Sequence, residues 1–179
     1  LIAQRRFEDA NTLRDAQQLD VPRLPVIRGT AGPGLPVLRL DGQGHADRTG
    51  LPDSGWRIVA LVHPYCGYSR RALDAIATDD RFAPLQGRLQ LVVPGGENWP
   101  ESQITDWNTA HADLPPMQPM QPSARWDALD PRQTPVFHLM RDGELVETTT
   151  GWTGSGEELL RLAQRMQQAD NPLPADSRR

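Results

Sequence analysis

The sequence is poor in the residues that most often carry covalent or metal chemistry. It holds one cysteine, Cys66, which excludes an internal disulfide framework and a metal site built on several cysteines. All 19 basic residues are arginine, and the absence of lysine excludes every mechanism that uses a lysine amine. The four histidines are scattered along the chain and do not favour a metal site.

The chain also lacks a long apolar run and an excess of positive charge. No apolar stretch reaches the length of a membrane span, so we expect no membrane-spanning helix. The net charge of -4, with 23% charged and 37% hydrophobic residues, is typical of a globular protein and does not favour nucleic acid as a partner. The 179 residues suffice for one domain with appendages. Leu1 instead of methionine opens the chain, which is compatible with removal of a leader or anchor.

The single cysteine lies where a predicted strand gives way to a predicted helix. Residues 57–62 are rich in Ile, Val and Leu, which predicts a buried strand ended by a proline. The helix is predicted to begin at Cys66, because Ala72, Leu73 and Ile76 then recur at helical spacing. The free N–H groups and the dipole of a helix N-terminus favour a thiolate. This position favours a reactive thiol over an inert buried one, which is the commoner state of a lone cysteine.

These residues resemble the active-site region of thioredoxin-fold proteins. The tetrad Cys66-Gly67-Tyr68-Ser69 is similar to the Cys-Gly-Tyr-Cys of periplasmic Dsb-type disulfide isomerases, with serine in place of the second cysteine. It is also similar to the Cys-Gly-Phe-Ser of monothiol glutaredoxins. Downstream, Thr134-Pro135 precedes a predicted strand, as the cis-proline does in the thioredoxin fold. The resemblance covers residues 56–166 and implies an α/β, thioredoxin-like fold with a central mixed sheet flanked by helices.

The resemblance also implies a role for each matching residue. The catalytic residues would be Cys66 as nucleophile, Ser69 and Pro135. The substrate-binding residues would be Tyr65, Gly67, Tyr68, Thr134 and Trp152, and the candidate modulators of the thiol are His63 and Arg70. Tyr65, Tyr68, Thr134, Pro135 and Trp152 are then expected to surround Cys66 as a shallow apolar groove for an extended client. Neither a metal nor a cofactor is implied, and the partners would be protein thiols and disulfides in the periplasm or another extracytoplasmic compartment.

Ser69 decides between several reaction types. A second cysteine at this position would release a mixed disulfide within one chain, and serine cannot do so. The chain is then a monothiol oxidoreductase resolved by glutathione or client thiols, a dithiol enzyme whose resolving cysteine has been replaced by an engineered serine, or a redox-inactive thioredoxin-like binding module. A glutaredoxin-like protein with glutathione and an iron–sulfur cluster is a further alternative. The missing lysine and a long insertion between residues 93 and 135 count against it.

The segment before the cysteine region is predicted to be an extension. Its expected elements are a helix at 2–19 docked on the domain or a partner chain, an extended linker at 21–36, an edge strand at 35–40 and a loop at 45–54. The predicted division of the chain is an extension over 1–50, a thioredoxin-like domain over 51–170 and a polar tail over 171–179.

The segment after the cysteine region is predicted to complete the sheet. Its expected elements are a strand at 88–93 parallel to 57–62, a helix at 102–112, a proline-dense loop at 114–122, a short helical turn at 126–129, a hairpin at 135–148 and a closing helix capped by Ser155. Met117 and Met120 in the loop favour either an adaptable contact surface or an ordered cover over the core. A third alternative is that this loop closes over the groove at Cys66.

Overall fold

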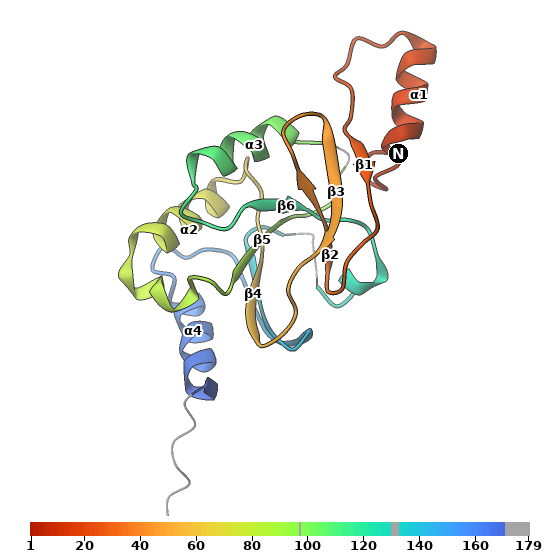
Figure 1. Ribbon diagram of the computed structural model, residues 1–179. Coiled ribbons are helices and arrows are strands. Elements are labelled where there is room, and N and C mark those ends of the chain that lie inside the picture. Colours follow the sequence, from red (N-terminus) through yellow and green to blue (C-terminus); the bar gives the residue numbers. More distant parts are fainter. Residues whose placement is uncertain (97, 130–132, 171–179) are drawn as a thin grey trace, which may run out of the picture.

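A five-stranded mixed sheet forms the centre of the molecule (Figure 1). The structure is a computed structural model that describes residues 1–96, 98–129 and 133–170. The strand order is β6-β5-β4-β7-β8. The parallel strands are β4 (Trp56–Leu61), β5 (Leu89–Val93) and β6 (Met117–Pro119), while β7 (Val136–Arg141) runs antiparallel to β4 and β8 (Glu144–Thr150) runs antiparallel to β7. The predicted central mixed sheet is confirmed, as is the parallel pairing of residues 57–62 with 88–93.

Alternation along the strands sends side chains into two separate cores. In β4, Ile58 and Ala60 pack into the first core, and Val59 and Leu61 pack into the second. The first core also contains side chains from the helices α2 (Gly67–Thr78), α3 (Glu101–Ala110) and α4 (Glu157–Asp170) and from the 3-10 helix η1 (Asp80–Leu85). The helices therefore cover one face of the sheet and leave the other face to a different part of the chain.

The N-terminal part of the chain covers the second face. It forms a three-stranded sheet in the order β1-β3-β2, from β1 (Val26–Arg28), β2 (Pro36–Leu40) and β3 (His45–Gly50). Val37 and Leu51 pack into the second core, and Val37 also forms a bridge with Met120 beyond β6. The extension therefore shares its core with the central sheet.

The two predictions for residues 21–36 and 45–54 were wrong where these segments form strands. The strand β3 has a polar sequence, but it pairs with β1 on one side and β2 on the other, so backbone hydrogen bonds hold it in place of apolar burial. The Asp41 carboxylate accepts hydrogen bonds from the backbone N–H groups of Gln43 and His45 and fixes the turn between β2 and β3. Arg28 in β1 pairs with Asp47 in β3 at 3.0 Å. Neither contact leaves a hydrophobic pattern in the sequence.

Two backbone segments of this N-terminal sheet pass each other so closely that only glycine fits. A Cβ atom on Gly50 would lie 1.6 Å from the carbonyl oxygen of Pro33. A Cβ atom on Gly34 would lie 2.0 Å from the carbonyl oxygen of Leu51, and Gly34 also has a φ of +81°. The sheet is therefore closed by a contact between main chains that a larger residue would separate.

The first helix, α1 (Phe7–Gln17), is shorter than the helix predicted for residues 2–19. It begins later because Arg5 adopts a left-handed conformation with φ of 56°. Its buried residues are Phe7 and Asn11, and Asn11 exchanges two hydrogen bonds of 2.9 Å with the backbone of Leu24. Figure 1 shows α1 at the edge of the molecule, beyond the three-stranded sheet. The predicted docking in cis thus holds along one side of the helix only.

A buried arginine anchors this helix to the rest of the molecule. The Arg5 guanidinium lies 4.8 Å from the ring centroid of Trp99 and donates a hydrogen bond of 3.2 Å to the carbonyl of Met120. Burial lowers its pKa to about 10. Phe7 packs edge-on against Trp99 with ring centroids 4.6 Å apart. These contacts connect α1 to the chain that leads into α3.

The proline-dense segment at 114–122 is not a loop throughout, because it contains the strand β6. Met117 and Met120 are both buried, the first in the core beneath the helices and the second in the core beneath the N-terminal sheet. Neither methionine forms an exposed contact surface or a lid over Cys66, so the two corresponding predictions were wrong. The next turn, η2 (Ala124–Trp126), lies slightly earlier than the turn predicted at 126–129.

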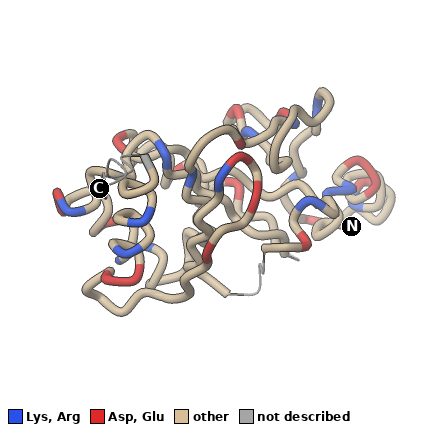
Figure 2. The backbone as a smooth tube through the Cα atoms, turned by 90° about the horizontal axis from the view of Figure 1, so that it is seen from below, with Lys and Arg blue, Asp and Glu red and all other residues tan. Residues whose placement is uncertain are grey.

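The hairpin and the closing helix have the predicted order. The strands β7 and β8 are joined through Asp142 and Gly143, which both have positive φ values, as a two-residue hairpin turn requires. The helix α4 begins at Glu157, two residues after Ser155. Figure 2 shows arginine and acidic segments intermixed along the chain, so this view presents no face of a single charge. The predicted tail at 171–179 lies outside the described residues.

Candidate active site

Cys66 occupies the N-cap position of α2, as the sequence predicts. Its backbone is extended, with φ of -79° and ψ of 113°, and its carbonyl accepts the first hydrogen bond of the helix from the Arg70 N–H at 3.0 Å. The thiol is partly exposed and donates a hydrogen bond of 3.3 Å to the carbonyl of Thr134. The cysteine is therefore held between a helix N-terminus and a segment that is 68 residues away in the sequence.

Ser69 lies in the first turn of α2 and is fully buried. Its hydroxyl oxygen accepts a hydrogen bond of 3.3 Å from the backbone N–H of His63. Because the oxygen accepts this bond, the hydroxyl hydrogen stays available for donation to a second group. Ser69 thus connects the end of β4 to the first turn of α2, a contact that the sequence alone did not indicate.

The surroundings of Cys66 favour its ionised form. Burial of the thiol raises its pKa, but the backbone N–H and hydroxyl of Ser69, the hydroxyl of Thr134 and the backbone N–H of Tyr68 lower it, so that the pKa of Cys66 lies below its ordinary value. In the neutral state the thiol hydrogen points to the Thr134 carbonyl, and no cap hydrogen bond to the helix is formed. On ionisation the sulfur becomes an acceptor for the Ser69 N–H and hydroxyl.

The ring of the predicted modulator His63 is held by its own chain neighbour, and its effect on the thiol stays a prediction. Its Nδ1 atom accepts a hydrogen bond of 3.3 Å from the Tyr65 N–H, which requires an unprotonated nitrogen. Burial lowers the pKa of His63, so the neutral ring is further favoured. The ring stacks on Tyr65 with centroids 5.2 Å apart. His63 therefore orients the aromatic residue next to the cysteine.

Two exposed tyrosines flank the cysteine. Tyr65 is 60% exposed and Tyr68 is 58% exposed, which is unusual for large rings on a folded surface. The guanidinium of Arg71 lies 4.6 Å from the ring centroid of Tyr68. The predicted modulator Arg70 is exposed and lies beside it in the same turn. Arg71 and not Arg70 contacts Tyr68, because residues three apart lie on one helix face.

The segment opposite Cys66 immediately precedes β7. The peptide bond between Thr134 and Pro135 is cis. Pro135 is buried, and its carbonyl accepts a hydrogen bond of 2.8 Å from the Gly151 N–H at the end of β8. Tyr65, Gly67, Tyr68, Thr134 and Pro135 are therefore grouped by the structure around the cysteine, either as its chain neighbours or through the Thr134 carbonyl.

Trp152 is placed in a different environment from the other predicted site residues. Its ring centroid lies 6.0 Å from that of Phe82 in η1. The ring also covers Gly156, where an added Cβ atom would come within 2.6 Å of it. Trp152 thus packs between η1 and the start of α4, and its part in substrate binding stays a prediction.

The described residues contain neither a candidate metal site nor a membrane span. No three His, Cys, Asp or Glu side chains within residues 1–96, 98–129 and 133–170 are grouped as metal ligands. In the same part of the chain, every helix is too short or too polar to cross a bilayer.

Solved structures with a similar fold exist, although no family model and no curated protein matches the chain. An uncharacterized thioredoxin-like protein from Porphyromonas gingivalis has a TM-score of 0.51 and 15% identity, with 75% of this chain and 90% of that chain covered. A candidate protein disulfide isomerase from Bacteroides thetaiotaomicron has a TM-score of 0.51 and 16% identity, with 80% of this chain and 90% of that chain covered. Together with the mixed sheet and the helix that begins after Cys66, these matches identify the chain as a protein of thioredoxin-like fold.

Proposed function

We propose that the chain is a monothiol oxidoreductase that exchanges disulfides with protein clients through Cys66. The observation that carries this proposal is the environment of the thiol, which is partly exposed at the N-terminus of α2 and lies 3.3 Å from the Thr134 carbonyl. A thiol at such a position is a better nucleophile near neutral pH than a free cysteine, because more of it is ionised. The candidate disulfide isomerase of similar fold supports the same class of reaction.

The reaction follows from the single thiol. The Cys66 thiolate attacks one sulfur of a client disulfide, so that a Cys66–client disulfide forms, the client disulfide breaks and the leaving thiolate takes up a proton. Ser69 has no sulfur with which to displace the client. A second thiolate, from glutathione or from a client cysteine, therefore attacks the mixed disulfide and returns Cys66 to its reduced form. No net oxidation occurs when the resolving thiol belongs to the same client, which is disulfide isomerisation.

The exposed tyrosines provide the proposed client surface. Tyr65 and Tyr68 flank the sulfur and leave large apolar faces in water, and Thr134 lies opposite. An extended client segment that contacts these rings and the backbone near Thr134 would be bound with little dependence on its sequence. Clients that contain disulfides occur in oxidising compartments, and we therefore place the protein outside the cytoplasm.

The pH dependence of Cys66 alkylation tests the proposed state of the thiol. We expect the alkylation rate to reach half its maximum at a pH below the pKa of a free cysteine, which is about 8.5. In Ser69→Ala the thiolate loses a charged hydrogen bond, for which roughly 1.5–3 kcal/mol is usual, so alkylation at pH 6 should slow by about tenfold or more. The loss of the His63 N–H partner should also lower stability, without unfolding the protein. Iodoacetamide kinetics followed by intact mass measure the half-point of the unmodified protein and the slower alkylation of Ser69→Ala. Urea denaturation measures the loss of stability.

The matched control is Arg70→Gln, which removes an exposed charge from the same turn of α2. Because water and salt screen an exposed charge, this change should move the half-point far less than Ser69→Ala does. The enzyme proposal is contradicted if the alkylation rate of the unmodified protein reaches half its maximum at a pH equal to or above that of a free cysteine. The second candidate function, a redox-inactive binding module that uses the exposed Tyr65 and Tyr68, would then remain.

A further inference from the structure

Two adjacent arginines of α2 lie close to the proposed nucleophile and have no acidic partner. Arg70 and Arg71 follow Ser69 in the helix, and both are exposed. Within the part of the chain that the structure describes, neither guanidinium group forms a hydrogen bond or an ion pair. Most of the other described arginines hold a carboxylate or a backbone carbonyl, as Arg81 holds Asp79 at 2.6 Å.

The side chain of Arg71 folds back along the helix towards the cysteine. Its guanidinium lies 4.6 Å from the ring centroid of Tyr68, and its Nη1 atom would lie 3.6 Å from a Cβ atom on Gly67. Gly67 directly follows Cys66, so this cation borders the partly exposed thiol. A guanidinium that lies over a ring keeps N–H groups at its edge, and these can donate to an anion. The arrangement therefore presents free hydrogen-bond donors beside the cysteine.

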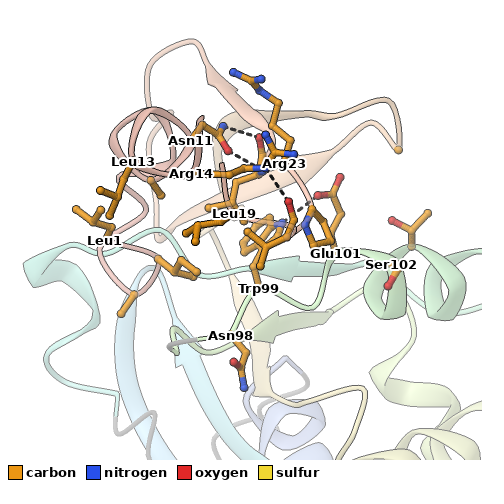
Figure 3. Close-up of a pocket in the computed structure, with 18 of the residues that line it drawn as sticks. Leu1, Asn11, Leu13, Arg14, Leu19, Arg23, Asn98, Trp99, Glu101 and Ser102 are labelled. Carbon is orange, nitrogen blue, oxygen red and sulfur yellow. Dashed lines mark hydrogen bonds between the residues drawn. The ribbon is translucent and has the colours of Figure 1, made fainter. Parts of the chain in front are cut away.

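The arginines at a cleft beside α1 are, in contrast, already bonded within the chain (Figure 3). This cleft of about 1120 Å³ lies between α1 and the start of α3, and Figure 3 labels Arg14 and Arg23 there. The Arg14 Nε donates to the carbonyl of Val21 at 2.7 Å, and Arg23 pairs with Asp15 at 3.1 Å. A hollow surface alone thus does not leave its cations free, and the pair in α2 requires a separate explanation.

The stability of the fold does not account for the two arginines of α2. Cations near the N-terminus of a helix oppose its dipole and are unfavourable for stability. The first acidic residue of α2 is Asp74, and its Oδ1 atom lies 3.9 Å from the Nε2 of His111 instead of pairing with Arg71. The whole chain has a net charge of -4, so the positive charge at this place is a local feature. A negatively charged partner would supply the missing interaction.

We propose that Arg70 and Arg71 select client segments in which glutamate or aspartate flanks the reacting cysteine. This inference rests on the proposed function of Cys66, and it adds a charge preference to a surface that otherwise binds clients through the two exposed tyrosines. Carboxylates accept hydrogen bonds from a guanidinium in a matching planar geometry. A client carboxylate bound at Arg71 would hold the neighbouring sulfur near the Cys66 thiolate and so raise the rate of attack.

Short peptides with blocked ends test the charge preference. Their central cysteine carries a thiopyridyl disulfide and is flanked on both sides by glutamate, glutamine or lysine. The Cys66 thiolate attacks the peptide sulfur and forms a Cys66–peptide disulfide, while the electron pair of the broken bond leaves with the thiopyridine, which takes up a proton. The absorbance of the released thiopyridine gives the rate. Division by the rate of the same peptide with mercaptoethanol removes differences in the intrinsic reactivity of the peptides.

We expect the glutamate peptide to react about fivefold faster than the glutamine peptide at low salt, because each exposed ion pair contributes modestly. The lysine peptide should react about fivefold slower than the glutamine peptide. At about 1 M salt, where the Debye length is about 3 Å, both differences should fall below about twofold. Arg71→Gln should remove most of the preference, and Arg70→Gln combined with Arg71→Gln should bring the ratio of the glutamate and glutamine rates to about one.

The matched control is Arg141→Gln. Arg141 is also exposed, and its guanidinium lies 5.2 Å from the ring centroid of Trp56. It pairs with Trp56 at the end of β4 that lies opposite to Cys66. This variant removes the same charge and the same kind of ring contact, and it should keep the full preference for the glutamate peptide.

The possible outcomes separate this inference from the proposed function. Equal rates for the glutamate and glutamine peptides overturn the inference and leave the function in place, because the neutral peptide still forms the disulfide. A preference that persists in the double variant, or that Arg141→Gln removes equally well, also overturns the inference. A protein that reacts with none of the three peptides contradicts the proposed function, and the inference with it.

Discussion

Replacing Ser69 with cysteine should convert the site into a dithiol that releases its own mixed disulfides. The new thiolate would attack the Cys66 sulfur, form a disulfide between positions 66 and 69, and free the client thiol, which takes up a proton. The two positions are separated by one turn at the start of α2, and the Ser69 hydroxyl is among the groups that lower the pKa of Cys66. A thiol held at this distance is equivalent to a local concentration of about 1 M or more.

The expected change in release rate is therefore large. Compared with resolution by about 1 mM external glutathione, release in Ser69→Cys should be on the order of 1000-fold faster. The unmodified protein should instead accumulate a long-lived adduct at Cys66 when it is treated with a disulfide-bearing peptide. Intact mass spectrometry over time distinguishes the two forms. Two free thiols in Ser69→Cys under oxidising conditions would contradict this prediction, and so would a failure of the unmodified protein to form any adduct.

The Ser69→Cys variant is also expected to be less stable than the unmodified protein. Ser69 is fully buried, and its oxygen accepts the His63 N–H. Sulfur is larger and a weaker acceptor, so we expect Ser69→Cys to lower the free energy of unfolding by roughly 1–2 kcal/mol. Ser69→Ala removes the same hydrogen bond without adding a thiol. It therefore separates the loss of stability from the gain of a resolving group.

Replacing Gly34 with alanine should strongly destabilise the N-terminal sheet. The added Cβ atom would lie 2.0 Å from the Leu51 carbonyl oxygen, and the φ of +81° disfavours any residue with a side chain. The left-handed conformation costs about 1–2 kcal/mol and the forced separation of the two backbones about 1–3 kcal/mol. We expect a loss of about 3 kcal/mol in the free energy of unfolding, measured by urea denaturation.

Gly29→Ala is the matched control for this prediction. Gly29 has a similar φ of +73°, but an added Cβ atom there meets nothing within 4 Å. Its loss should be limited to the conformational part, about 1 kcal/mol. Equal losses in the two variants would show that the contact between residues 34 and 51 contributes nothing, which contradicts the crossing of the two backbones seen in the structure.

The sequence predicts those parts of the fold where burial leaves a pattern. The strand at 57–62, the helix after Cys66 and the hairpin at 135–148 all alternate or repeat as their buried faces require, and the structure contains all three. The strand β3 was missed because its residues are polar and are held by backbone pairing on both sides. The strand β6 was missed because three prolines in 115–119 suggested a loop, although Met117 and Pro119 fit beside an edge of the sheet.

The candidate site was predictable as a position but not as a set of contacts. The residues around Cys66 and the pair Thr134-Pro135 carry a recognisable motif, so their approach could be expected. The hydrogen bond between the His63 N–H and the Ser69 hydroxyl forms only because the end of β4 lies beside the first turn of α2. The types of these two residues do not predict that contact. The place of Trp152 against Gly156 is likewise a packing result, because a tryptophan beside glycines fits several surfaces.

The shared core beneath the N-terminal sheet limits how the chain can be shortened. Val37 and Leu51 pack with Val59, Leu61 and Val92 in the core on the second face of the central sheet, where Trp126 of η2 also packs. A protein cut at residue 51 would keep Cys66 and every strand of that sheet, yet it would expose to water the apolar side chains that Val37 covers. Such exposure promotes aggregation. The extension thus covers part of the sheet that carries Cys66, and we expect proteolytic trimming to cause aggregation before it alters the thiol.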